Sequence, residues 1–263
     1  MKKFPLLLLS AFLGLFLLNF PLHTIHAEST LTMGILTNDQ PYSVQKNGKW
    51  QGFSVELAQK LATESNKKIT FKAYSSTEKL TTALKSGKVD FILGDKANFS
   101  TAFKSTESFL YPKNVLFTRT DAKAKSLEKL AGKKVGLLQT GQQTALLKQL
   151  GLKPVSFATT AELMDALANK KISAAILNED TYQAYLKEHP ELIKPAADAT
   201  SDQKAAVLHK ISDPSILAQS LSLITYKQPK VQKLLTTSLT ELQDSSQLTT
   251  LSQKYFGQDL TIK

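Results

Sequence analysis

Few residues in this sequence have the types and spacing of catalytic groups. The chain has no cysteine, which excludes thiol catalysis, thiolate metal sites and disulfides. It also lacks the nucleophile pattern G-x-S-x-G, the zinc pattern H-E-x-x-H and the phosphate loop G-x-x-x-x-G-K-[ST]. His189 and His209 are more typical of surface residues than of ligands. We therefore expect neither an enzyme nor a protein that carries a metal or another cofactor.

The strands and helices that would position any site residues are predicted by hydrophobic periodicity. From residue 30 onward, short apolar runs alternate with amphipathic stretches. The first series comprises strands at 32–35, 69–74 and 89–93, a hairpin turn at Asn47-Gly48, and helices at 55–63 and 77–85. The run 89–93 (VDFIL) is almost continuously apolar, which indicates a strand covered on both faces.

A second series of the same kind begins after residue 120. It comprises strands at 134–138, 155–157 and 174–177, and helices at 126–131, 142–150, 159–167 and 179–187. Residues 190–214 give no clear pattern, whereas 221–226 predicts a strand and 229–256 predicts two helices. Strand–helix alternation indicates α/β layers with largely parallel sheets, and two series in one chain indicate two lobes.

The charge balance is strongly basic, with 33 Lys and Arg against 22 Asp and Glu, a net charge of +11. Arg119 is the only arginine, and the lysines are scattered singly or in pairs. Proteins that read nucleic acid usually cluster arginine along one element. We therefore expect no nucleic-acid partner and interpret the lysines as a solvated surface that suits an anionic cell envelope.

The N-terminus predicts export. Lys2 and Lys3 precede an apolar run over 6–18, and a polar stretch ends at Ala27, which is the order of a signal peptide over 1–27. The alternative is an uncleaved anchor, although 5–22 is short for a span of about 20 residues and contains two prolines. Without a cysteine the protein is not a lipoprotein, so we expect an extracellular, cell-surface or periplasmic location.

Six motifs stand in an order that matches one protein family. They are GILTNDQPY (34–42), NGKWQGFSVELA (47–58), LKSGKVDFIL (84–93), SLEKLAGKKVGLL (126–138) with the loop at Gly141, the stretch 161–177, and the stretch 226–257 that ends in LSQKYFG. The chain thereby resembles, over about 31–258, the extracytoplasmic solute-binding proteins of polar amino-acid ABC importers, known as family 3.

The resemblance implies a two-lobed α/β protein with the periplasmic-binding-protein type 2 fold. Each lobe would be a mixed sheet flanked by helices, and two crossover segments would join the lobes. Lobe 1 would comprise 29–119 plus 218–263, and lobe 2 would comprise 120–217. A small solute would be captured in the cleft by hinge closure and passed to an ABC permease complex at the membrane by a monomeric protein.

The resemblance also implies a clamp for an amino acid, from which this sequence departs. In the family an Arg after the strand at 89–93 binds the carboxylate, and an Asp at the end of the strand at 174–177 binds the ammonium. Here the Arg position falls on Ala102 or Phe103, and the Asp position falls on Asn178. A zwitterion buried between lobes needs both charges compensated. Free Glu, Asp, Arg, Lys and His are therefore expected to bind poorly.

The candidate ligand-binding residues follow from the same correspondence. They are Asp39, Tyr42, Gly94, Asp95, Asn98, Thr140, Gly141, Gln142 and Asn178. Tyr42 could instead pack within its lobe without touching a ligand. Asp95 and the adjacent Lys96 could instead form a solvated charge pair that contributes little to binding. Asn178 could instead cap the helix that begins at Glu179.

Two other functions remain open from the sequence alone. The same fold serves dehydratases that act on prephenate-like acids, for which Glu179 or Asp95 would be the acid. The scaffold could also have lost its ligand and serve as a sensor or an adhesin, because fold alone does not decide function.

Overall fold

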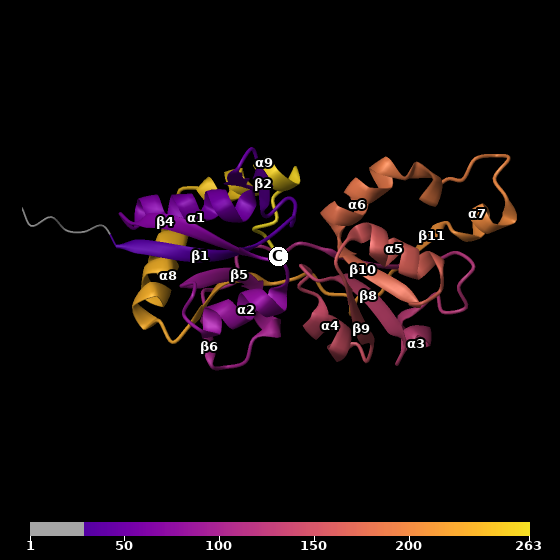
Figure 1. Cartoon of the computed structure of the whole chain (residues 1–263), viewed down its shortest axis with the longest axis horizontal. Coiled ribbons are helices and arrows are strands. Elements are labelled where there is room, and N and C mark those ends of the chain that lie inside the picture. The colour runs from indigo at the N-terminus through magenta and orange to yellow at the C-terminus, as the bar shows by residue number, and fades with distance from the viewer. Residues whose placement is uncertain (1–28) are drawn as a thin grey trace, which may run out of the picture.

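The computed structural model describes residues 29–263, and it consists of two α/β lobes side by side (Figure 1). The predicted signal peptide or anchor over 1–27 lies outside the described residues. The two-lobed α/β architecture expected from the alternating pattern is confirmed.

The first lobe is built on a mixed five-stranded sheet in the order β4-β1-β5-β12-β6. These strands are β4 (Lys68–Tyr74), β1 (Thr30–Leu36), β5 (Phe91–Asp95), β12 (Leu221–Tyr226) and β6 (Phe103–Ser105). β1 runs parallel to β4 and β5, whereas β12 runs antiparallel to β5 and β6. The lobe also contains α1 (Phe53–Glu64), α2 (Thr77–Lys85), η1 (Lys96–Asn98), α8 (Pro229–Asp244), α9 (Gln247–Phe256) and the hairpin of β2 (Val44–Lys46) and β3 (Lys49–Gln51).

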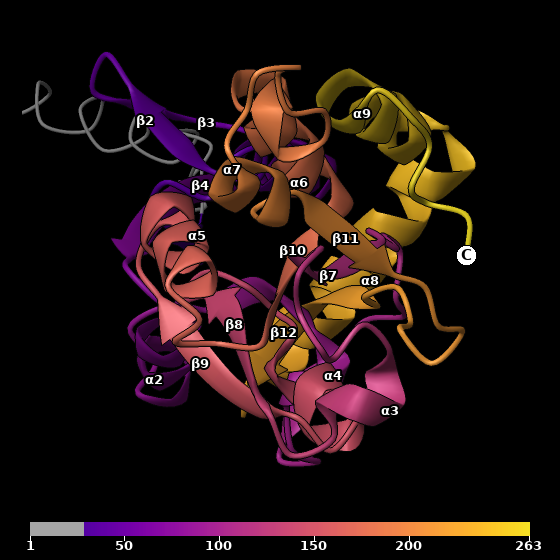
Figure 2. The same ribbon diagram turned by 90° about the vertical axis from the view of Figure 1, so that its right-hand side faces the viewer.

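The second lobe is built on another mixed five-stranded sheet, in the order β11-β7-β10-β8-β9. These strands are β11 (Leu208–Ile211), β7 (Asn114–Arg119), β10 (Ala174–Asn178), β8 (Lys134–Leu138) and β9 (Lys153–Phe157). The helices are α3 (Leu127–Leu130), α4 (Thr144–Gln149), α5 (Thr160–Ala168), α6 (Glu179–Glu188), η2 (Pro190–Leu192) and α7 (Ser201–Ala205). Figure 2 shows α5 and α6 on one side of this sheet and α3 and α4 on the other.

Alternation along β10 explains why both faces of the second sheet are covered. Ala175 and Leu177 belong to the apolar cluster beneath α5 and α6, whereas Ala174 and Ile176 belong to the cluster beneath α3 and α4. All four side chains are buried. Successive side chains of a strand point to opposite faces, so an unbroken apolar run such as this one requires a helix layer on each side.

Several element boundaries follow from local chemistry. The Ser76 side chain caps α2 by accepting a hydrogen bond from the Lys79 N–H at 3.3 Å, and Thr159 caps α5 in the same way through the Glu162 N–H at 3.1 Å. Asn47 and Gly48 both have positive φ, at 50° and 73°, as a tight hairpin turn requires.

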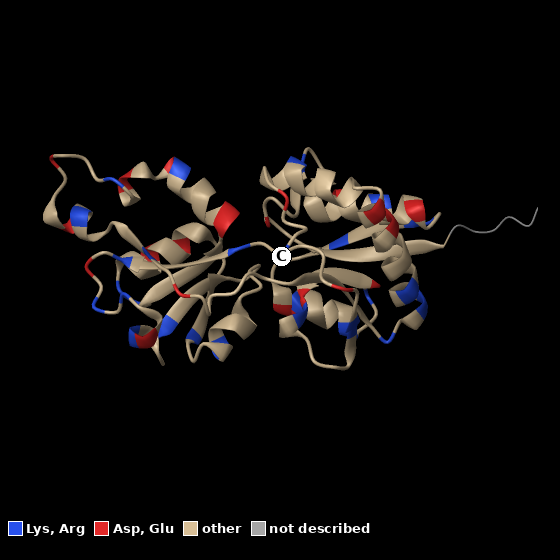
Figure 3. Ribbon diagram, turned by 180° about the vertical axis from the view of Figure 1, so that it is seen from behind, with Lys and Arg blue, Asp and Glu red and all other residues tan. Residues whose placement is uncertain are grey.

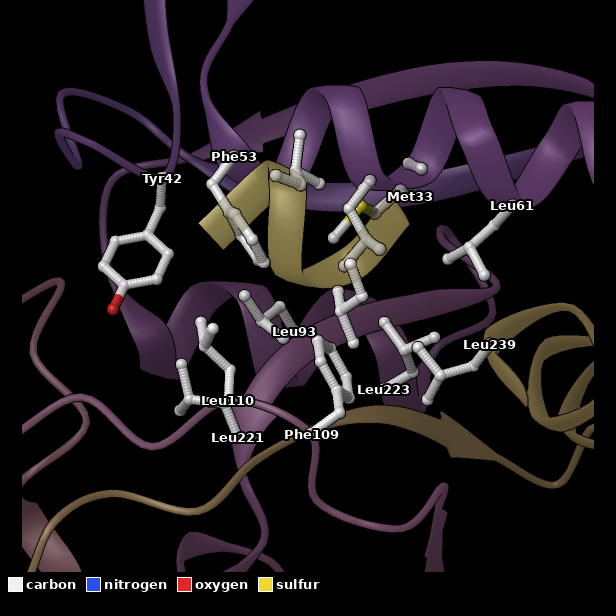
Figure 4. Packing of buried hydrophobic residues seen from close by; sticks show 14 of the residues in the cluster. Met33, Tyr42, Phe53, Leu61, Leu93, Phe109, Leu110, Leu221, Leu223 and Leu239 are labelled. Carbon is white, nitrogen blue, oxygen red and sulfur yellow. The ribbon is translucent and has the colours of Figure 1, made fainter. Parts of the chain in front are cut away.

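The core of the first lobe gathers around the aromatic ring of Phe53, at the start of α1 (Figure 4). Phe53, Phe91 and Phe109 are fully buried and come from a helix, a strand and the first crossover segment. Burying a side chain of this size contributes roughly 1.5–3 kcal/mol. This core therefore holds β1, α1 and Tyr42 in fixed relative positions, and with them the loop that follows β1.

Two crossover segments join the lobes and run antiparallel to each other. The Leu221 N–H donates to the Leu110 carbonyl, and the Gln219 N–H donates to the Pro112 carbonyl, each at 2.9 Å. β7 follows the first crossover and pairs with β10 and β11 of the second sheet. The predicted end of the first stretch of lobe 1 at residue 119 is therefore too late, since 114–119 forms a strand of lobe 2.

Charged residues are spread over the surface of both lobes (Figure 3). Lys and Arg lie on the outer helices and loops rather than along one element. Arg119 is engaged locally, donating to Asp121 at 2.8 and 3.1 Å and to the Ala168 carbonyl at 2.6 Å. That nucleic acid is not a partner stays a prediction.

Candidate functional site

A pocket lies between the lobes and is lined by residues of both. Its apolar lining comes from both lobes and consists of Met33, Ile35, Leu36, Leu80, Leu93, Leu138, Leu177 and Leu221. Its polar lining consists of Asp39, Tyr42, Ser43, Ser54, Thr140, Gln142, Gln143, Asn178, Thr181 and Gln219. Pockets of this kind bury a small solute against apolar walls and orient it with a few polar groups.

The topology explains the position of the pocket. β1 and β5 are parallel in one sheet, and β8 and β10 are parallel in the other. The polar residues follow the carboxyl ends of β1, β8 and β10, where the loops of the two lobes meet. Ligands of open α/β sheets bind beyond these strand ends.

Asp39 is held rigidly in the loop after β1. Its backbone N–H and carbonyl exchange hydrogen bonds with Ser43 at 2.8 and 2.7 Å. The residue is half-buried and lines the pocket. Burial between the lobes raises the pKa of Asp39 from 3.8 to about 7, although a hydrogen bond from the Thr140 side chain opposes the rise. Its carboxylate is the only charged group lining the pocket among residues 29–263.

Tyr42 packs in the core of the first lobe and also lines the pocket. Its ring packs in the first core, 6.2 Å from the ring of Phe53 and 5.3 Å from that of Phe256. Its hydroxyl points away from that cluster (Figure 4), is buried, and has no hydrogen-bond partner. Burial, followed by the charges of Asp39 and Asp180, raises the pKa of Tyr42 well above 10, so the hydroxyl keeps its proton.

The loop 140–143 reaches across to the first lobe. The Gln142 side-chain oxygen accepts from the Asp95 N–H at 3.3 Å. Gly141 is required by close packing in the loop, because a Cβ there would lie 2.5 Å from Oε1 of Gln143 and 3.0 Å from the Leu138 carbonyl. Thr140, Gly141 and Gln142 all line the pocket, as expected from the sequence.

Four amide side chains join the second lobe to the second crossover. Nε2 of Gln219 donates to Oδ1 of Asn178 at 2.6 Å and to Oδ1 of Asn114 at 3.2 Å. Nε2 of Gln143 donates to the same two oxygens. Asn178 makes no side-chain capping bond to α6, so the structure does not support the capping alternative. The Gln219 Oε1 atom is buried without a partner.

Three of the predicted site residues lie outside this pocket. Gly94 is buried within β5, where a Cβ would lie 2.8 Å from the ring of Phe99. Asp95 accepts from the Ala97 N–H at 3.0 Å and from the Ser220 N–H at 3.4 Å, and burial raises its pKa against these bonds. Asn98 is exposed and joins the lobes directly, as described below.

The positions that would carry the family's arginine do not face the pocket. Ala102 is exposed, and the Phe103 ring packs 5.1 Å from Phe99 and 5.0 Å from Tyr226. Lys104 follows on the same strand, β6, at the edge of the first sheet, and is exposed. None of these three residues lines the pocket, and no other Lys, Arg or His in the described part of the chain lines it either.

Gln143, Thr181 and Gln219 line the pocket but were not among the predicted site residues. Gln143 adjoins the predicted loop residue Gln142, and that adjacency was a usable signal. Thr181 lies in the first turn of α6, the helix that begins directly after the predicted site residue Asn178. Gln219 lies between the unpatterned stretch 190–214 and the strand predicted over 221–226, where the sequence predicted no element and no site residue.

No group of three His, Cys, Asp or Glu residues in the described part of the chain is arranged to hold a metal ion. No helix within 29–263 combines the length and the apolar composition needed to cross a membrane.

Two α/β lobes, antiparallel crossovers and a mixed polar and apolar pocket between them define a solute-binding protein of the periplasmic-binding-protein type 2 fold. Residues 31–258 match the bacterial extracellular solute-binding proteins, family 3, and the chain belongs to that family. The expected family, fold and solute-binding function are confirmed.

Individual relatives agree with this assignment. The chain is 29% identical over 213 residues to a probable histidine-binding protein of Campylobacter jejuni, covering 73% of this chain and 80% of that protein. It is 25% identical over 269 residues to the arginine-binding extracellular protein ArtP of Bacillus subtilis, covering 97% and 98%. A solved substrate-binding protein of an amino acid ABC transporter matches the fold with a TM-score of 0.67 at 16% identity, covering 88% of this chain and 100% of that one. The family and these relatives are binding proteins rather than enzymes.

Proposed function

We propose that this protein is exported, captures an amino acid or amino-acid-like solute between its lobes, and delivers it to an ABC permease complex as a monomer. The names of the two relatives, which refer to histidine and arginine, support an amino acid as the class of solute. The observation that carries the proposal is that both lobes and one crossover line a single polar pocket.

Contacts outside the pocket support closure as the mode of capture. The Thr77 N–H and hydroxyl, at the start of α2, both donate to the Gln139 carbonyl of the second lobe, at 3.0 and 3.2 Å. A solute that touches both lobes binds the closed arrangement better than the open one and therefore shifts the population toward closure.

The placement of the acids favours binding over a dehydratase activity. Asp95 bonds to backbone N–H groups outside the pocket, and Glu179 does not line it. Asp39 has no histidine, lysine or second carboxylate beside it in the described pocket lining to complete an acid–base pair.

The proposal is tested with the purified protein beginning at Glu28. Mass spectrometry after denaturation identifies any co-purified solute, and a thermal-shift screen covers the twenty amino acids, their amides and dipeptides. A solute present at a hundred times its dissociation constant stabilises the fold by about 2.7 kcal/mol.

A bound solute should also reduce the radius of gyration in small-angle scattering, and cells lacking the protein should lose uptake of that solute. Failure of every compound to shift the melting temperature, with no co-purified solute, would contradict the proposal. Light scattering coupled to size exclusion tests the monomer.

A further inference from the structure

The electrostatics of the pocket restrict what its solute carries. Asp39 contributes a carboxylate, and no Lys, Arg or His lines the pocket among the described residues. A second carboxyl group, that of Asp180 in the first turn of α6, also acts on the Tyr42 hydroxyl. A solute that enters this space therefore meets carboxyl groups, and no Lys, Arg or His lines the pocket among residues 29–263.

Two buried polar atoms in the pocket wall lack partners. They are the Tyr42 hydroxyl and Oε1 of Gln219, on side chains only 6% and 2% exposed. Buried polar atoms in folded proteins are nearly always hydrogen-bonded, so a pair of unpartnered atoms in one pocket indicates where a ligand bonds. The tyrosine offers an O–H donor, and the glutamine offers a neutral acceptor.

A free carboxylate fits these groups poorly. The Asp39 carboxylate would repel it, and no arginine lines the pocket to bind it through two hydrogen bonds. Burying a charge without a partner is strongly unfavourable. The Tyr42 hydroxyl alone gives it one neutral donor. A neutral carbonyl or hydroxyl oxygen satisfies the same donor without that electrostatic penalty.

We propose that the solute is a cation whose carboxyl function is absent or neutralised, as in an amine, amide or ester of an amino acid. Its ammonium or guanidinium bonds to Asp39 and another N–H bonds to Oε1 of Gln219; in an amide or ester, the neutral carbonyl oxygen also accepts from Tyr42. This inference rests on the proposed function and narrows its solute class.

The direct test compares solutes that differ only in the carboxylate. Isothermal titration calorimetry at pH 7 is run with arginine, argininamide and agmatine, and with lysine, lysinamide and cadaverine. The amide or amine of at least one set is expected to bind more tightly than its acid by roughly 10- to 100-fold, the range set by one bond to a charged group.

Equal or tighter binding of both acids would overturn the inference, and so would a failure of all the amides and amines to bind. Binding of a neutral or anionic solute in the wider amino-acid screen would overturn it while leaving the proposed function in place. The two hypotheses can therefore fail separately.

A pair of matched variants tests the assigned partner. Asp39→Asn removes the charge and keeps the shape, and we expect it to weaken amide or amine binding roughly 10- to 100-fold. Asp244→Asn is the control, because Asp244 is exposed at the end of α8 and does not line the pocket. Loss of affinity in both variants, or in neither, would contradict the assignment.

A measurement on the unaltered protein guards against misfolding of Asp39→Asn. The groups that act on Asp39 are the Thr140 hydroxyl, which donates a hydrogen bond to it, and Tyr42. Asp180 acts on the same tyrosine. A bound cation favours the ionised carboxylate, which burial alone holds partly protonated near pH 7. Agmatine, whose cationic groups stay protonated from pH 6 to 8, should bind more tightly at pH 8 and release protons at pH 6. Binding of agmatine that is independent of pH would refute the role of Asp39.

Discussion

Replacing Asn98 by Ala should favour the open arrangement of the lobes. Asn98 lies in η1 of the first lobe and bonds twice to the second lobe. Its Nδ2 donates to the Gln142 carbonyl at 2.7 Å, and its Oδ1 accepts from the Ala145 N–H at 2.9 Å. Because Asn98 does not line the pocket, the change acts on lobe closure rather than on solute contacts.

The magnitude follows from the number and exposure of these bonds. A side-chain hydrogen bond contributes about 0.5–1.5 kcal/mol net, and both bonds are exposed, which favours the lower half of that range. Losing both bonds should destabilise the closed state relative to the open state by roughly 1–2 kcal/mol, which lowers the equilibrium constant for closure about 5- to 30-fold. The apparent dissociation constant rises by the same factor where binding requires closure.

Titration of any solute found by the thermal-shift screen measures this shift, and scattering at saturating solute shows whether the variant still closes. Asn169→Ala is a matched control, because the Asn169 side chain donates only to the Asp165 carbonyl within one lobe. An Asn98→Ala protein with unchanged affinity and an unchanged scattering curve would refute the role of these bonds in closure.

Three further expectations concern stability in the absence of solute. The raised pKa of Asp39 means that the native state binds more protons than the unfolded chain between pH 3.8 and about 7, so the melting temperature should fall from pH 5 to pH 8, and less steeply in Asp39→Asn. Phe53→Ala removes a fully buried ring and should cost about 3–5 kcal/mol in chemical denaturation, with Phe53→Leu losing less. Tyr42→Phe removes an unpartnered buried hydroxyl and should leave the empty protein as stable or more stable, whereas a loss above about 1 kcal/mol would mean that the hydroxyl has a partner.

Much of the fold follows from signals that are local in the sequence. The predicted bounds of α2 and β8 match the structure, because a serine cap marks the start of α2 and a short continuous apolar run marks β8, both without reference to distant residues. β7 was missed, since its strand character depends on antiparallel pairing with β10 and β11, which lie far along the chain. That pairing also moves the lobe boundary and makes the second sheet mixed rather than largely parallel, as the antiparallel strand β12 does in the first sheet.

The site was less predictable because it is assembled from segments that lie far apart in the sequence. Asp39 and Thr140 become neighbours only when the lobes meet, and no spacing rule relates residues of two lobes. Gln219 enters the pocket because the crossover runs antiparallel to its partner segment, and its surrounding sequence has no periodicity. The loss of the arginine was visible from the sequence, whereas only the structure shows that, among residues 29–263, no other cationic side chain lines the pocket in its place.

The polar groups left without partners explain how such a cleft could distinguish its empty and filled states. The direct bonds between the lobes, at Asn98 and Thr77, favour closure whether or not a solute is present. The closed empty pocket also buries the Tyr42 hydroxyl and Gln219 Oε1 unpaired and desolvates Asp39, and each of these effects opposes closure. A solute that satisfies all three groups removes that penalty only in the closed state. Closure driven by a ligand requires that the solute bind the closed state more tightly than the open state. Here that difference in affinity comes from the Tyr42 hydroxyl, Gln219 Oε1 and Asp39, the groups that the empty closed pocket leaves unsatisfied.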